Sequence, residues 1–157
     1  MRRILPLLLL LPFVTEGAGD AALDRATLKG LKSLGVVVDP IDPELAKEGL
    51  AQDTFRAHLE DKLRNAGLPV QANSTEFLGF RLLPVRDSRG PYAVCLSIGL
   101  YQPVTLVRDS KIRTATQTWE AGTVLMAPPK LVYRATIESL DELVDQFIAA
   151  WRSVNPQ

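Results

Sequence analysis

Apolar residues follow two different periods along this chain, and each period predicts a different kind of element. Over residues 53–65 they recur every three or four positions, as on one face of a helix that Asp53 would cap. Gly67 then supplies a left-handed stop. A second stripe of this kind covers residues 139–154, where Ser139 begins a capping box. Both segments are therefore expected to be amphipathic helices.

Before the first helix and between the two helices, short segments are either apolar throughout or alternate between apolar and polar residues. Both patterns predict strands. The expected strands lie at residues 36–38, 68–72, 76–86, 92–108 and 112–120. The fourth is too long to remain straight in a domain of this size, so we expect it to bend near Gly99 and Pro103. Its two halves would then pair with the strands before and after it.

Two amphipathic helices need an apolar sheet face to cover. The predicted fold is therefore α+β, a two-layer sandwich in which a bent antiparallel sheet of about five strands carries both helices on one face. The expected order of elements is β-α-β-β-β-β-α. At 157 residues, the chain has the length of one such domain.

The N-terminus has the pattern of a secretory signal. Two arginines follow Met1, and residues 4–14 are all apolar or proline before the chain turns small and polar. A membrane-spanning helix would need about 20 apolar residues, and this run stops well short of that. Small residues at the positions that flank cleavage fit processing after Gly19 or after Ala21. Residues 1–19 are thus predicted to be a signal peptide and residues 20–157 a single domain.

The kind of signal predicts the destination. A lipoprotein needs a Cys at the cleavage point, but the only Cys is Cys95, and the Arg2-Arg3 pair lacks the surroundings of a twin-arginine signal. We therefore expect a Sec-type signal and a periplasmic or secreted protein. Cleavage after Gly19 leaves 16 of 18 basic and 17 of 18 acidic residues, a net charge of −1. This gives no preference for anionic lipid, and no membrane insertion is expected after signal cleavage.

Composition also excludes several kinds of chemistry. The balanced charge argues against nucleic acid as a partner, and one His with one Cys rules out a disulfide framework and Cys/His-rich zinc sites. His58 and Cys95 could form a catalytic dyad only with each other. They are expected on opposite sides of the sheet, with Cys95 buried or half-buried. The chain has no P-loop or dinucleotide motif. No cofactor, resident metal or catalytic residue is predicted.

One acidic cluster follows the first predicted strand. Asp39, Asp42 and Glu44 stand around two prolines, without the central Gly that a helix–loop–helix calcium site requires. Asp-Pro turn chemistry is the favoured interpretation, with a weak calcium site as the alternative.

The candidate binding surface is the sheet face that the helices leave open. Tyr101, Gln117 and Trp119 are predicted to lie there, where an aromatic pair among small and polar residues would form a partner surface. In the alternative interpretation, residues 121–129 fold across this face and make it part of the core.

The succession of these segments resembles small bacterial envelope proteins of unknown function. The resemblance rests on three segments: residues 49–70, with a helix and the loop that follows it, the strand at 116–119, and the C-terminal end from Phe147 through Trp151 to Pro156. The layout is also similar to the amino-terminal domain of the Tol-system propeller protein and to auxiliary lipoproteins of envelope transport. The lipid-anchor Cys of those lipoproteins is absent here. The resemblance implies no particular functional residue.

These observations predict an exported, non-enzymatic interaction or accessory domain with an envelope protein as its partner. Two alternatives belong to other classes. One is a carrier of a small apolar ligand, with a pocket between the sheet and the C-terminal helix beneath Phe147 and Trp151. The other is a small hydrolase that uses carboxylates. The sequence does not determine the oligomeric state.

Overall fold

The computed structural model describes residues 19–86 and 90–156, so residues 1–18 of the predicted signal peptide lie outside the described part. The described elements are, in chain order, α1 (Ala22–Ala26), β1 (Gly35–Val38), α2 (Pro43–Lys47), α3 (Gln52–Asn65), β2 (Phe77–Arg86), β3 (Tyr92–Leu106), β4 (Asp109–Ala127) and α4 (Pro129–Val154). The α+β class is confirmed. The sheet of the described residues has four strands instead of the expected five.

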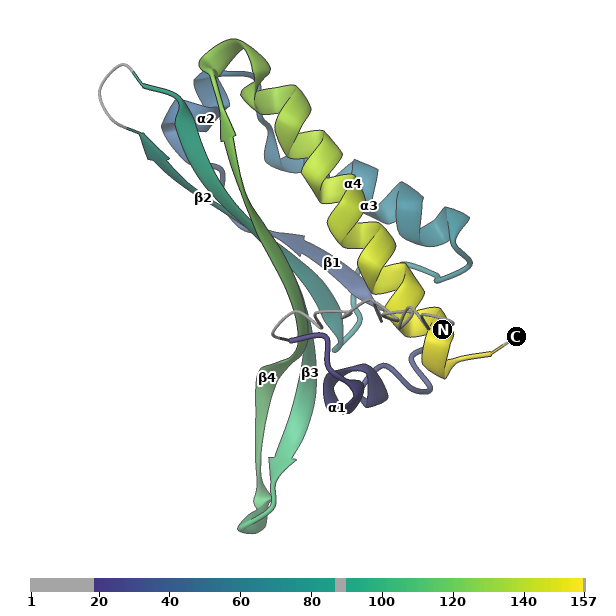
Figure 1. The fold of residues 1–157 in the computed structure, drawn as a ribbon. Helices are drawn as coiled ribbons and strands as arrows, with labels where there is room; N and C mark the ends of the chain where they lie inside the picture. Colours follow the sequence, from purple (N-terminus) through teal and green to yellow (C-terminus); the bar gives the residue numbers. More distant parts are fainter. Residues whose placement is uncertain (1–18, 87–89, 157) are drawn as a thin grey trace, which may run out of the picture.

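The strands lie in the order β1-β2-β3-β4, and the sheet is mixed (Figure 1). β1 runs parallel to β2, whereas β2–β3 and β3–β4 are antiparallel pairs. The prediction of a wholly antiparallel sheet is therefore wrong. Its cause is the connection between β1 and β2, which contains α2 and α3 and returns the chain to the same end of the sheet, as parallel neighbours require.

The strand expected at residues 68–72 does not form. This segment makes one isolated parallel bridge, between Val70 and Leu34. Pro69 has no amide hydrogen to donate, and a turn follows at residues 72–73, so the ladder cannot extend. Gly67 ends α3 with a φ of 89°, which confirms the predicted left-handed stop.

The second half of the chain departs most from the predicted boundaries. β4 continues to Ala127, opposite Tyr92, instead of ending at residue 120. α4 begins at Pro129, ten residues before the predicted start, and Ser139 lies inside it and not at its cap. Proline is accepted in the first turn of a helix, where its missing N–H has no intrahelical partner. Asp53 likewise lies inside α3, and Ala51 takes the cap position.

The core lies between the sheet and the two long helices, which cover one face as predicted (Figure 1). Leu78, Phe80, Val94, Leu96 and Ile98 point to this face, and each is at most 1 % exposed. They meet Leu59 and Leu63 of α3 and the apolar stripe of α4 in one cluster. Within the described residues, no helix is long and apolar enough to cross a membrane.

The far half of the β3–β4 hairpin projects beyond the helices (Figure 1). Its pairing shifts register twice, between Leu100 and Tyr101 and between Thr105 and Leu106. The first shift lies between Gly99 and Pro103, where the sequence predicted a bend. A β-bulge of this kind adds twist and reverses the alternation of faces along the bulged strand.

Candidate functional site

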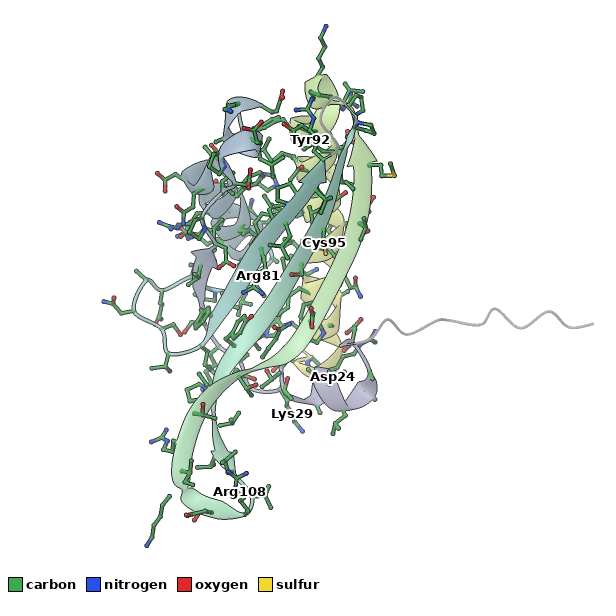
Figure 2. The ribbon with its side chains drawn as sticks, turned by 90° about the vertical axis from the view of Figure 1, so that its left-hand side faces the viewer. Asp24, Lys29, Arg81, Tyr92, Cys95 and Arg108 are labelled. Carbon is green, nitrogen blue, oxygen red and sulfur yellow. The ribbon has the colours of Figure 1, made fainter. Side chains whose placement is uncertain are left out.

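In the part of the chain that the structure describes, no helix lies on the second face of the sheet, which forms a continuous open surface. In Figure 2 this face lies in front of α4, with Arg81 on β2 and Cys95 on β3. The pairing register arranges its side chains in rows that cross the strands. One row joins Phe77, Tyr101 and Gln117, and the next joins Val37, Gly79, Gly99 and Glu120. Arg81 and Ser97 form the third row.

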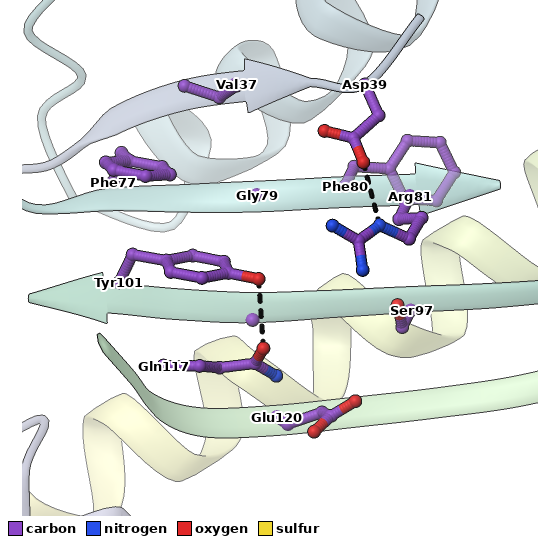
Figure 3. Close-up of a pocket in the computed structure, with 11 residues that line it drawn as sticks. Val37, Asp39, Phe77, Gly79, Phe80, Arg81, Ser97, Tyr101, Gln117 and Glu120 are labelled. Atoms are coloured by element: carbon purple, nitrogen blue, oxygen red, sulfur yellow. Dashed lines mark hydrogen bonds and ion pairs between the residues drawn. The ribbon is translucent and has the colours of Figure 1, made fainter. Parts of the chain in front are cut away.

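A hollow of about 300 Å³ lies over these three rows (Figure 3). Its floor is backbone, because Gly79 and Gly99 face each other across β2 and β3. A Cβ on Gly99 would lie 2.6 Å from Nε2 of Gln117, and one on Gly79 would lie 3.0 Å from the ring of Tyr101. Because the two glycines have no side chains, Gln117 and Tyr101 can lie flat over the sheet beside them. The missing side chains also leave the space of the hollow unfilled.

Two aromatic rings form one end of the hollow. Phe77 and Tyr101 are cross-strand neighbours whose rings stack with centroids 5.0 Å apart and an interplanar angle of 8°. The Tyr101 hydroxyl donates to Oε1 of Gln117 at 3.0 Å. This bond leaves the Gln117 amide nitrogen as a donor beside the glycine floor. The rings and the amide thus form a rigid wall that is apolar on one side and polar at its tip.

An ion pair forms the opposite end. Nε of Arg81 donates to Oδ2 of Asp39 at 2.8 Å, and Asp39 directly follows β1 (Figure 3). The hydrogen bond and charge of Asp39 raise the pKa of Arg81 above its already high value, so the guanidinium stays cationic. Among the described side chains, none hydrogen-bonds to the Ser97 hydroxyl or the Glu120 carboxylate. The hollow therefore presents both donors and acceptors to a ligand or a partner side chain.

An exposed apolar area continues from the hollow toward the other end of the same face. Leu83, Cys95 and Val124 form one row across three strands, and Val85, Ala93 and Met126 form the next. The four large side chains here, Leu83, Val85, Val124 and Met126, are between 55 % and 74 % exposed. We refer to these six residues as the apolar end. Adjoining large apolar side chains of this exposure are typical of interaction surfaces.

The structure brings together two of the three residues predicted for this face. Tyr101 and Gln117 meet in the hollow, but Trp119 lies on the opposite face, 1 % exposed, edge-on to Phe147 at 5.1 Å. The bulge is the cause, because Leu100 pairs with Trp119 while Tyr101 pairs with Gln117, which leaves Thr118 as the extra residue. The shared face predicted for Tyr101 and Trp119 is therefore wrong. Residues 121–127 extend β4 and do not fold across the open face.

Sequence reasoning missed the charged part of the hollow. Asp39 and Arg81 are 42 positions apart, and only the parallel pairing of β1 with β2 brings them together. The alternating pattern of β2 already placed Arg81 opposite the core-facing Leu82 and Phe80, so its face could have been predicted. Its partner was missed because the predicted sheet was wholly antiparallel, although the helix predicted between the first two strands is the kind of connection that joins parallel neighbours.

The residues weighed for catalysis do not converge. The His58 ring nitrogen lies 2.8 Å from Oδ1 of Asp141, between α3 and α4, whereas Cys95 is exposed on the open face. Their predicted separation is confirmed, but Cys95, which was expected to be buried or half-buried, is exposed. Asp42 accepts from the Glu44 amide at 2.8 Å and caps α2, which confirms Asp-Pro turn chemistry there. The described residues contain no group of three potential metal ligands.

The space proposed for an apolar ligand contains aromatic side chains. Phe147 packs against Trp119, and the Trp151 indole donates to the Leu31 carbonyl at 3.0 Å. Phe147 is fully buried and Trp151 is nearly so. The interface between the sheet and α4 is thus occupied at the place where the carrier hypothesis requires a cavity.

Comparison with known proteins gives only distant likenesses. No protein-family model and no curated protein matches the chain. Among solved structures, a PelC variant dodecamer from Paraburkholderia phytofirmans is 10 % identical, with a TM-score of 0.42 over 73 % of this chain and 85 % of that one. A minor lipoprotein from Acinetobacter baumannii is 11 % identical, with a TM-score of 0.33 over 76 % and 91 %. Neither likeness is close enough to carry a statement about function.

Proposed function

We propose that this protein is an exported, non-enzymatic binding domain that holds an envelope protein through the open face of its sheet. The observation that carries the proposal is the continuity of that face. The polar hollow and the apolar end share the same three strands, and no described segment covers either of them. A partner would gain apolar burial at one end and directional hydrogen bonds at the other.

The two parts of the face have different roles in this proposal. Burial of the apolar end supplies affinity. A fully exposed large apolar side chain gains about 1.5–3 kcal/mol on complete burial, and these four, which are 55–74 % exposed, gain the corresponding part of that amount. The hollow supplies selectivity. A partner side chain that enters it must match Arg81 and Glu120 as well as the Tyr101–Gln117 wall, and a mismatch leaves polar atoms unpaired.

Site-specific photo-crosslinking in the native envelope tests this proposal. Leu83 of the apolar end and Leu131 of α4 offer a matched pair, because both are exposed leucines, at 55 % and 54 %. A photoreactive residue at position 83 is expected to form one adduct of defined mass, and the same residue at position 131 is expected to form none. Equal adducts at both positions, or none at position 83, would contradict the proposal.

A second substitution shows whether the adduct depends on the face itself. Val124→Asp places a carboxylate two strands from position 83, in the same cross-strand row. The adduct at position 83 is expected to disappear in this variant, because a partner would have to desolvate the new charge. Glu138→Asp on α4 serves as the control and should leave the adduct unchanged.

A further inference from the structure

The first described residues are bound tightly to the domain through one carboxylate. Asp20 is only 4 % exposed. Its Oδ1 accepts from Nε of Arg25 and from Nε1 of Trp119, at 2.8 and 2.7 Å. Its Oδ2 accepts from Nη2 of Arg25 and from Nε2 of Gln146, at 2.8 and 3.1 Å. Four donors from α1, β4 and α4 therefore converge on a single side chain.

The buried Trp119 indole has its N–H acceptor in this carboxylate. Its ring is buried, and Asp20 is the one hydrogen-bond partner that the described residues give its N–H. A buried donor that loses its acceptor costs free energy without compensation from water. Arg25 also balances the charge that Asp20 brings into this place. Removal of Asp20 would thus leave the buried indole N–H of Trp119 without the acceptor that it has in the folded domain.

This contact distinguishes the two cleavage positions that the sequence allows. Cleavage after Ala21 would remove Asp20 together with Ala21, whose carbonyl accepts the Arg25 amide at 2.9 Å at the start of α1. Cleavage after Gly19 retains both residues. Among the contacts of the described residues, it removes the bond in which the Glu120 amide donates to the Gly19 carbonyl, and Glu120 is exposed, so water can replace that acceptor.

We propose that the leader is removed at the Gly19–Asp20 bond and that Asp20, as the new first residue, then locks the N-terminus onto Trp119. This inference rests on the export that the proposed function includes. The reaction is a hydrolysis by the leader-removing protease of the exporting cell. Water breaks the C–N bond, its hydroxyl completes the carboxyl group of Gly19, and its proton goes to the amine of Asp20.

The geometry also orders the events. In the folded domain Gly19 has a φ of 93°, and a Cβ there would lie 2.8 Å from the Glu120 carbonyl oxygen. The bond to be cleaved therefore lies against the edge of β4, where a protease cannot draw it out as an extended strand. Cleavage must precede the docking of residues 19–21 onto β4. The lock forms afterwards.

N-terminal sequencing and intact mass of the exported full chain, purified by a C-terminal tag, test the bond assignment. We expect Asp20 as the first residue. A mature chain that begins at Ala22, or at any other processed position, would overturn the inference and leave export intact. An unprocessed chain that stays in the cytoplasm and begins at Met1 would contradict export, and with it the proposed function.

Purified chains that begin at Asp20 and at Ala22 test the lock independently of processing. The chain that begins at Ala22 is expected to unfold at a lower urea concentration, or to fail to fold. The chain that begins at residue 20 and carries Asp20→Asn should also show a lower midpoint. Asp53→Asn, on an exposed carboxylate of α3, should leave the midpoint unchanged. Equal midpoints for the chains that begin at Asp20 and at Ala22 would refute the lock.

Discussion

The Asp20→Asn substitution tests how the buried carboxylate stabilises this fold. Asparagine keeps the shape of the side chain, but it replaces one acceptor oxygen by an NH2 group that faces the donors of Arg25 and Gln146. Hydrogen bonds to a charged group contribute about 1.5–3 kcal/mol each in favourable cases. Because Arg25 is about one-third exposed, its pairing is screened, and we expect a loss of about 2–3 kcal/mol at neutral pH.

The effect should depend on pH with a definite sign. Burial by itself would raise the pKa of Asp20, but the hydrogen bonds from Arg25, Trp119 and Gln146 and the charge of Arg25 outweigh it and hold the pKa below its usual value of 3.8. The stabilisation is therefore complete above the pKa of the unfolded chain, and it is lost as the pH falls through the lower folded value. The difference in stability between the wild-type chain and the Asp20→Asn variant should accordingly narrow below about pH 4.

Urea unfolding of the mature chain, followed by circular dichroism at about pH 7 and about pH 3, measures this difference. The Asp53→Asn variant controls for the loss of one negative charge and should unfold like the wild type at both pH values. A loss below about 0.5 kcal/mol at neutral pH would mean that Asp20 behaves as an ordinary surface residue. A larger loss that stayed constant on acidification would show that its charge is not the source of the stability.

Three further substitutions or reactions test other parts of the structure. Trp119→Phe removes the indole donor and part of the packing against Phe147, so urea unfolding should show a loss of about 1–3 kcal/mol, whereas an exposed ring would give almost none. Gly67→Ala should cost about 1 kcal/mol by the same method, because an L-residue resists its φ of 89°, and an unchanged midpoint would contradict the left-handed stop. The Cys95 thiol should react with a maleimide in the folded protein as fast as in urea, and strong protection without denaturant would show that the open face is covered.

Features that repeat within a few residues could be predicted from the sequence. The helical spacing of Phe55, Leu59 and Leu63 and the alternation through Val94, Leu96 and Ile98 specify which side chains face the core, and all six are buried. When one face of an element is buried, the spacing of its apolar residues shows whether the element is a helix or a strand. It also shows which of its faces points to the core. The α+β class and the placement of two helices on one sheet face followed from this local pattern.

Boundaries were less predictable, because the chain carries several acceptable start and stop signals. Ser139 and Glu142 match a capping box, yet the helix continues through them from Pro129. The helix that begins at Pro129 is favoured over one that begins at Ser139, because Val132 and Thr136 extend its buried stripe along the sheet. β4 likewise continues beyond its predicted end at residue 120, because its residues up to Ala127 pair with β3, the last of them with Tyr92.

Only the tertiary structure decided which surface is available for binding. One inserted residue, Thr118, sends Trp119 into the core and leaves Gln117 beside Tyr101, and the sequence of β4 alone contains no sign of it. The Asp39–Arg81 ion pair depends on a parallel strand pairing, and the Asp20–Trp119 contact joins residues 99 positions apart. Local sequence determined the periodicity of each element and thus its buried face. Register and long-range polar contacts depend on which segments meet in space, since their energies arise only after the chain has folded.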